Sequence, residues 1–206
     1  MRHLRILAVF FAFLSVSLPA HAQHDARISA SLSSAFGDGG PAPAVAFAAA
    51  LPVFSRTRLE VEGTYVRNLD FGRYYSCPPD AICAAVVSFP FVLTGDAVSL
   101  GGNLVAEVPW HTRRIRPYVV GGSGIAHVRR EQLETRYDRT TALTRTSSTA
   151  PLLTAGGGVE FLLGNRLVLA ADARYQRLFE KDRFHRIDIP PNLDLVRVGS
   201  AIGYRF

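Results

Sequence analysis

The last eleven residues of the chain alternate between two kinds of side chain, and this pattern constrains the fold more than any other feature. Apolar or aromatic residues take most of the even positions: Val196, Val198, Ile202, Tyr204 and Phe206. Small or charged residues take the odd positions: Arg197, Gly199, Ala201, Gly203 and Arg205. A period of two puts the two kinds on opposite faces of a β-strand. Such a strand fits a half-buried sheet in a soluble protein, or the last strand of a transmembrane β-barrel whose apolar side chains face lipid.

The start of the chain has the pattern of an export signal. The basic stretch Met1–Arg5 precedes an apolar run over residues 6–16, and Ala20-His21-Ala22 supplies a small-x-small cleavage pattern. The apolar run is too short to anchor the chain in a membrane. We expect cleavage of residues 1–22, which leaves residues 23–206 as one domain. No later segment is both long and uncharged enough for a transmembrane helix, so any membrane span of the exported chain must be β.

Alternation of the same kind recurs through the rest of the chain, in segments long enough for a tilted strand to cross a bilayer. Eight segments show it: 27–36, 44–53, 58–67, 97–108, 117–128, 153–163, 167–179 and 193–206. In most of them one face carries bulky apolar residues and the other carries acidic and basic ones. We therefore predict an all-β fold, an eight-stranded antiparallel up-and-down transmembrane β-barrel.

The connections between these segments alternate in length. Short connections fall at 54–57, 109–116 and 164–166, whereas long, polar ones fall at 70–96, 129–150 and 180–192. The connection at 37–43 belongs to the second group but is brief. Short turns at one end and long loops at the other are typical of outer-membrane barrels, with the turns in the periplasm.

The chain resembles the small eight-stranded outer-membrane β-barrel family, which includes the OmpA barrel and its OmpX-like relatives. The export signal, the segment Gly156–Phe161, the segment Leu167–Tyr175 and the ending Gly203-Tyr204-Arg205-Phe206 carry the resemblance. It implies the outer membrane of a Gram-negative bacterium, with outer-membrane lipid and lipopolysaccharide as surroundings. It also implies that Tyr204 and Phe206 form a signal read by the barrel-assembly machinery, after periplasmic chaperones have escorted the chain.

The inward faces of the predicted strands carry charges of both signs. The set comprises Arg27, Arg58, Glu60, Glu62, Glu107, Glu160, Asp172, Arg174, Arg197 and Arg205. An eight-stranded barrel is only wide enough for side chains to fill its interior. Because unpaired charges away from water are costly, we expect these residues to pair in a polar network that plugs the lumen. The alternative is a narrow pore or a proton path.

The only two cysteines, Cys77 and Cys83, lie in the first long connection. In an exported chain they are expected to form a disulfide. The spacing is not that of a CxxC redox or metal pair, and no histidine lies nearby as a second kind of ligand.

Several arginines and aromatics belong to the expected membrane boundaries. Arg129, Arg130 and Arg183 are candidates for contacts with lipopolysaccharide phosphates, since a guanidinium pairs bidentately with phosphate. A plain solvated loop is the alternative. At the other end, an aromatic girdle is expected from four residues: Trp110, Tyr118, Tyr204 and Phe206.

No catalytic, cofactor or metal site is predicted. The charge of +6 for the whole chain is mild and dispersed, which gives nucleic-acid binding no support. His127 is followed by Val128-Arg129, so the His-x-Ser pattern of the lipid A deacylases is missing. We expect a monomeric barrel without enzyme activity, with a structural or surface-interaction role. The alternatives are a small pore for ions or solutes, a lipid-modifying enzyme and a soluble periplasmic lipocalin-like binder.

Overall fold

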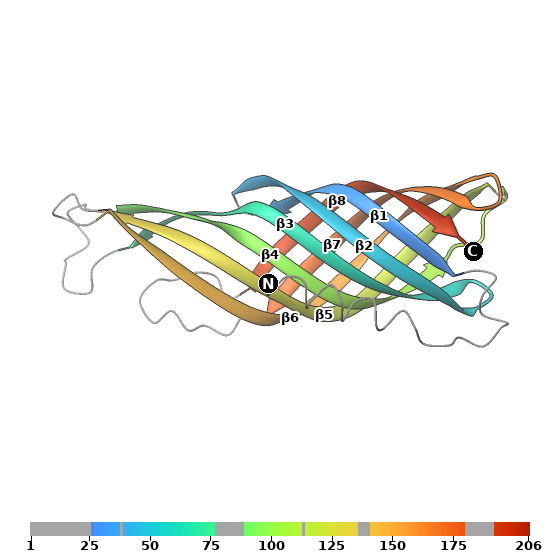
Figure 1. Cartoon of the computed structure of the whole chain (residues 1–206), viewed down its shortest axis with the longest axis horizontal. Helices are drawn as coiled ribbons and strands as arrows, with labels where there is room; N and C mark the ends of the chain where they lie inside the picture. The colour runs from blue at the N-terminus through green and yellow to red at the C-terminus, as the bar shows by residue number, and fades with distance from the viewer. Residues whose placement is uncertain (1–25, 38, 77–88, 113, 136–140, 180–191) are drawn as a thin grey trace, which may run out of the picture.

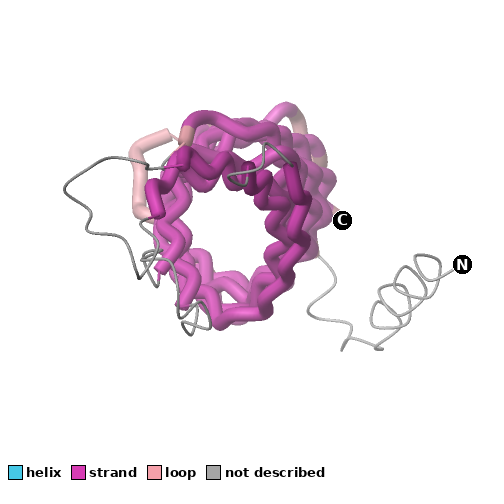
Figure 2. Tube along the Cα trace, turned by 90° about the vertical axis from the view of Figure 1, so that its left-hand side faces the viewer, coloured by secondary structure: helices cyan, strands magenta, loops and turns pink. Residues whose placement is uncertain are grey.

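The computed structural model describes residues 26–37, 39–76, 89–112, 114–135, 141–179 and 192–206. Nearly all of them belong to eight β-strands that hydrogen-bond in sequence order into a closed barrel (Figures 1 and 2). The strands are β1 (Arg27–Gly37), β2 (Gly40–Phe54), β3 (Thr57–Ser76), β4 (Phe89–Glu107), β5 (Ile115–Thr135), β6 (Thr141–Leu163), β7 (Leu167–Phe179) and β8 (Asn192–Arg205). All neighbours are antiparallel, and β1 pairs with β8 to close the ring. Among the described residues there is no helix of the length and apolarity needed to cross a bilayer.

The predicted fold class and the number of strands are confirmed, but two predicted loops were wrong. Strands β3 and β4 run through most of 70–96, and β5 and β6 run through most of 129–150. The pairing of β5 with β6 continues without a break, for example at Arg129↔Ser147 and Glu131↔Arg145. Four neighbouring strands therefore extend beyond the other four on one side of the barrel, which Figure 1 shows at its left-hand end. We call this part the β3–β6 extension.

The short connections lie together at the opposite end. Residue Gly164, with φ of +72°, helps to turn the chain between β6 and β7, a conformation that glycine adopts without steric cost. At the end that carries the β3–β6 extension, the chain reverses tightly between β1 and β2, where Gly37 pairs with Gly40. The expected connection at 37–43 is therefore mostly strand. In outer-membrane barrels the end with the short turns faces the periplasm. We therefore call this end of the barrel the periplasmic end, and the end with the β3–β6 extension the extracellular end.

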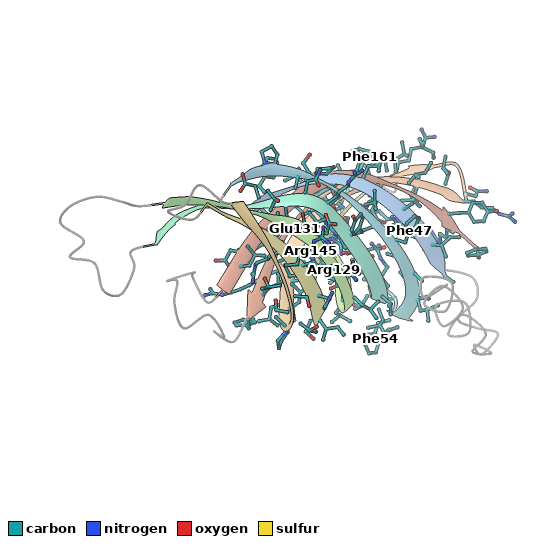
Figure 3. All side chains as sticks on the ribbon, turned by 60° about the vertical axis from the view of Figure 1, so that its left-hand side comes forward. Phe47, Phe54, Arg129, Glu131, Arg145 and Phe161 are labelled. Atoms are coloured by element: carbon teal, nitrogen blue, oxygen red, sulfur yellow. The ribbon has the colours of Figure 1, made fainter. Side chains whose placement is uncertain are left out.

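The outer surface is apolar, as the alternation predicted. Leu32, Phe47, Ile125, Leu153 and Ile202 are each at least half exposed and point away from the lumen. Figure 3 labels Phe47 and Phe161 on this surface and Phe54 at its periplasmic edge. Exposed apolar side chains around a whole barrel form a lipid-facing band.

A bulge in β3 changes which residues face inward. The pairing of β3 with β4 shifts register between Val66 and Leu69, and Asn68 has a positive φ of 53°. The extra residue moves the inward face from even to odd positions. As a result Leu69 is completely buried inside the barrel, whereas Arg67 and Asn68 are exposed.

Candidate functional site: the barrel lumen

Seven of the eight strands contribute polar side chains to the periplasmic half of the lumen, and β2 contributes none to this network. Its inward positions there are the small residues Ala46, Ala48 and Ala50. The long side chains of the other strands occupy the space that these alanines leave. Alternate residues of each strand point inward. Because the sheet is closed into a ring, their polar side chains meet in one central cluster.

Glu160 on β6 is the centre of the part of this cluster that is nearer to the short turns. Its Oε1 accepts a hydrogen bond from Arg27 Nη1 at 2.5 Å and another from Arg58 Nη2. Arg58 also reaches Glu107 at 3.4 Å, and Arg116 reaches the same carboxylate at 3.6 Å. One buried carboxylate, 5% exposed, therefore joins strands β1, β3 and β6 across the lumen.

Arg174 on β7 is the centre of the part that is farther from the short turns. Its Nη1 lies 2.8 Å from Glu60 Oε1 and 2.8 Å from Glu62 Oε2, and its Nε donates to Asp172 at 2.8 Å. Asn103 donates to Glu60 at 3.3 Å from the neighbouring strand β4. Three carboxylates surround one guanidinium, so the cluster depends on further arginines for charge balance.

Arg197 on β8 provides the next positive charge. It is 1% exposed, and its two terminal nitrogens donate to Thr64 Oγ1 at 2.6 Å and to Glu62 Oε1 at 2.7 Å. Thr64 donates in turn to the same Glu62 oxygen at 3.1 Å. A planar guanidinium that holds two acceptors in a fixed geometry suits such a buried position better than a lysine would.

The described ion pairs of the lumen balance in charge. Five arginines take part, Arg27, Arg58, Arg116, Arg174 and Arg197, and five acids, Glu60, Glu62, Glu107, Glu160 and Asp172. A cavity of about 20 Å³ lies among them. A cavity of that size has room for about one water molecule. Nine of the ten residues predicted for the lumen are therefore brought together, and the tenth, Arg205, lies at the end of β8.

A second, apolar layer lies in the lumen on the extracellular side of this network. Leu69, Val128, Leu178 and Leu195 are at most 2% exposed and pack together with buried alanines of β1 and β2. The sequence predicted a polar network in the lumen, and this apolar layer was not predicted. The bulge that turns Leu69 inward is one reason, because alternation counted without a bulge places this residue outside.

Tyr118 was assigned wrongly to the aromatic girdle. It is 5% exposed and points into the lumen, where its hydroxyl donates to Asp172 at 3.4 Å and the Arg58 guanidinium lies 5.4 Å from its ring centre. Strand β5 is rich in glycine, so its sequence shows no clear alternation of apolar and polar side chains. The inward face of this strand could therefore not be identified. Arg116 was likewise placed in a turn, but it begins the inward face of β5.

The remaining girdle aromatics lie where they were expected. Trp110 is 59% exposed in the turn before β5, and Phe206 is 57% exposed beside the end of β8. The rings of Tyr204 and Phe206 pack edge to face with centres 5.3 Å apart. Their expected role as an assembly signal stays a prediction.

The arginines proposed to contact lipopolysaccharide are divided between the two faces of β5. Arg129 is exposed, and Figure 3 shows it near Glu131 and Arg145, whose side chains form an ion pair of 2.8 Å on the outer surface of the β3–β6 extension. Arg130 instead points inward and is 6% exposed, so an outer contact for Arg130 was wrong. Arg183, Cys77 and Cys83 lie outside the described residues.

The described lumen holds ion pairs but no arrangement that would bind a metal. Among the described residues no three His, Cys, Asp or Glu side chains gather as metal ligands. The one described histidine of β5, His127, shares a hydrogen bond of 2.9 Å with Thr149 at an exposed position.

The fold is that of a small, closed, eight-stranded barrel of the outer-membrane type. No family model and no curated protein matches the sequence. Among solved structures, a major outer membrane protein from Thermus thermophilus is similar at 14% identity, with a TM-score of 0.60 over 89% of this chain and 100% of that one. Neisserial surface protein A is similar at 15% identity, with a TM-score of 0.54 over 88% of this chain and 96% of that one. At these identities the similarity establishes the fold alone.

Proposed function

We propose that this protein is a non-conducting, non-enzymatic barrel of a Gram-negative outer membrane, with a structural role at the cell surface. The observation that carries the proposal is the pair of buried side-chain layers inside the lumen. A neutral network of ion pairs occupies the periplasmic half, and an apolar layer centred on Leu69, Leu178 and Leu195 lies on its extracellular side. An ion would have to break several buried ion pairs and then cross a dry layer, which opposes conduction.

The same network argues against catalysis in the lumen. The carboxylates of Glu60, Glu62 and Glu160 are each held by arginines at short distances, and the space between them is about 20 Å³. A general acid or base needs access to a substrate, and this space accommodates no more than a water molecule.

The surface role is proposed to lie in the β3–β6 extension. Its outer face carries Arg129 and the ion pair Arg145–Glu131, above the exposed apolar residues Ile125 and Leu153. This is the height at which lipopolysaccharide phosphates would meet an outer-membrane barrel. Exposed guanidinium groups at this height would bridge such phosphates and fix the barrel in the outer leaflet.

Bilayer recording tests the closed lumen. The refolded protein, checked by its faster gel migration before boiling, is added to planar bilayers. We expect no steady conductance above that of the bare bilayer. As a matched comparison, Leu69→Ala, Leu178→Ala and Leu195→Ala are combined with Arg58→Ala and Arg174→Ala, which should produce a leak if the barrel still closes. Steady ion conductance by the wild-type protein would overturn the proposal.

The outer contact has a separate test. The variant Arg129→Gln/Arg145→Gln should retain less lipopolysaccharide than the wild type after extraction from outer membranes. Removal of two arginines from the opposite end, Arg114→Gln/Arg166→Gln, is the matched control and should leave retention unchanged. Equal retention by all three proteins would exclude a contact through Arg129 and Arg145.

A further inference from the structure

A basic depression lies at the periplasmic rim, where the turn between β6 and β7 meets the start of β5 and the end of β8. Its volume is about 780 Å³, and four arginines line it: Arg114, Arg116, Arg166 and Arg205. None of the side chains that line it is acidic. We call this feature the rim depression. It is separate from the central lumen cavity, with which it shares no lining residue.

Backbone hydrogen bonds hold the walls of the rim depression in place. The amide of Leu162 donates to the carbonyl of Arg114 at 2.9 Å, and the amide of Arg205 donates to the carbonyl of Arg166 at 2.8 Å. These two bonds tie the segments before β5 and after β6 to their neighbours. The four guanidinium groups therefore extend from fixed backbone positions rather than from a long loop.

The contacts of Arg166 and Arg116 leave positive charge at the rim. Arg166 Nη1 donates to the neutral hydroxyl of Tyr204 at 2.9 Å, which does not compensate its charge. Arg116 reaches Glu107 at 3.6 Å, but Arg58 shares that carboxylate. Arg114 and Arg166 are exposed side chains, so an anion in solution or in a membrane surface can reach both.

The edge of the depression is apolar. Leu163 and Phe206 line it and are 49% and 57% exposed, and they continue into the lipid-facing band. An anion-binding site bordered by lipid-facing side chains matches a ligand with an anionic head and apolar chains. A pocket of several hundred Å³ is also of the size that accommodates such a headgroup.

We propose that the rim depression binds the phosphate headgroup of an anionic phospholipid in the periplasmic leaflet. Arg114 and Arg166 would pair with the phosphate oxygens, and the acyl chains would follow Leu163 and Phe206 into the bilayer. The inference rests on the proposed membrane location, and it adds a lipid-binding site at the end opposite to the lipopolysaccharide contacts.

Lipid enrichment in nanodiscs tests this inference. The barrel is reconstituted in nanodiscs of phosphatidylethanolamine with a minor share of phosphatidylglycerol, and retained lipids are identified by native mass spectrometry after release. We expect the wild type to retain phosphatidylglycerol in preference to phosphatidylethanolamine. Loss of two charge-assisted contacts in Arg114→Gln/Arg166→Gln should lower this preference by about tenfold or more. The single charge reversal Arg166→Glu provides a second variant if the first does not fold.

Arg56→Gln is the control, because it removes an exposed arginine from another turn at the same end of the barrel, outside the rim depression. Unchanged preference in Arg114→Gln/Arg166→Gln, or an equal loss in the control, would overturn the inference. Excess inorganic phosphate distinguishes the two sources of a phosphate group: it should not displace the lipid, and complete displacement would assign the site to soluble phosphate instead. Every protein is first checked for heat-modifiable gel migration, so a barrel that does not insert is distinguished from one that inserts but does not select lipid.

Discussion

Arg197 shows how much stability a single residue of the lumen can carry. Its guanidinium is 1% exposed and bonded to both Glu62 and Thr64. Arg197→Met should lower the free energy of unfolding by about 3–5 kcal/mol, because it leaves part of a buried carboxylate without its partner. The measurement is urea unfolding in lipid vesicles, followed by Trp110 fluorescence and by gel migration.

Arg145→Gln is the control for Arg197→Met, since it also removes an arginine from an ion pair but at an exposed position. The Arg145 and Glu131 side chains are 73% and 47% exposed, and such pairs contribute about 0–1 kcal/mol. Equal loss of stability in the two variants would mean that the lumen is far more hydrated than its packing indicates.

At this scale the sequence predicted where the charged residues lie, but it could not predict their partners. Alternation placed Glu60, Glu62 and Arg174 on one face, and they do meet in the lumen. Which arginine reaches which acid depends on the stagger of strands around the ring, which a period of two does not contain. The inward position of Tyr118 was not predicted for a related reason. The glycines on its strand have no side chain, so the alternation does not show which face of the strand is inward.

At the scale of elements, the exposed aromatics of β2 make a prediction about depth in the membrane. Phe47 lies in the middle of β2 and is 63% exposed, whereas Phe54 lies at its periplasmic end and is 72% exposed. Phe47→Arg should cost about 2–4 kcal/mol of stability in vesicles, and Phe54→Arg about 0–1 kcal/mol, because the cost of a charge depends on its depth. Unfolding titrations of both variants give the comparison. A soluble barrel with both residues in water would show small and similar effects.

The lengths of β3 to β6 could not be read from alternation. Residues 145–149 are Arg, Thr, Ser, Ser and Thr, and a strand with both faces polar has the same composition as a solvated loop. Their strand structure depends on pairing with β5, a contact that local sequence does not specify. The bulge at Asn68 could not be predicted either, because it depends on the register of β3 with β4.

At the scale of the whole molecule, the orientation of the barrel can be tested by labelling. In a Cys77→Ser/Cys83→Ser background, Arg145→Cys should react with a membrane-impermeant thiol reagent on intact cells. Arg166→Cys should react only after the outer membrane has been made permeable, because its turn is on the periplasmic side. Labelling in the opposite order would reverse the assignment of the two ends, and with it the leaflets proposed for the two lipid contacts.

The ion pairs across the lumen also bear on how such a barrel can form. Arg197 and Glu62 are separated by 135 positions in the sequence, and Arg27 and Glu160 by 133. Neither pair can form before the sheet has curled far enough to bring distant strands together, so a partly closed sheet carries its inward charges without these partners. Contacts of such long sequence separation slow folding. We expect closure to be the step at which the chain commits, with charge neutralisation inside the ring following it rather than guiding it.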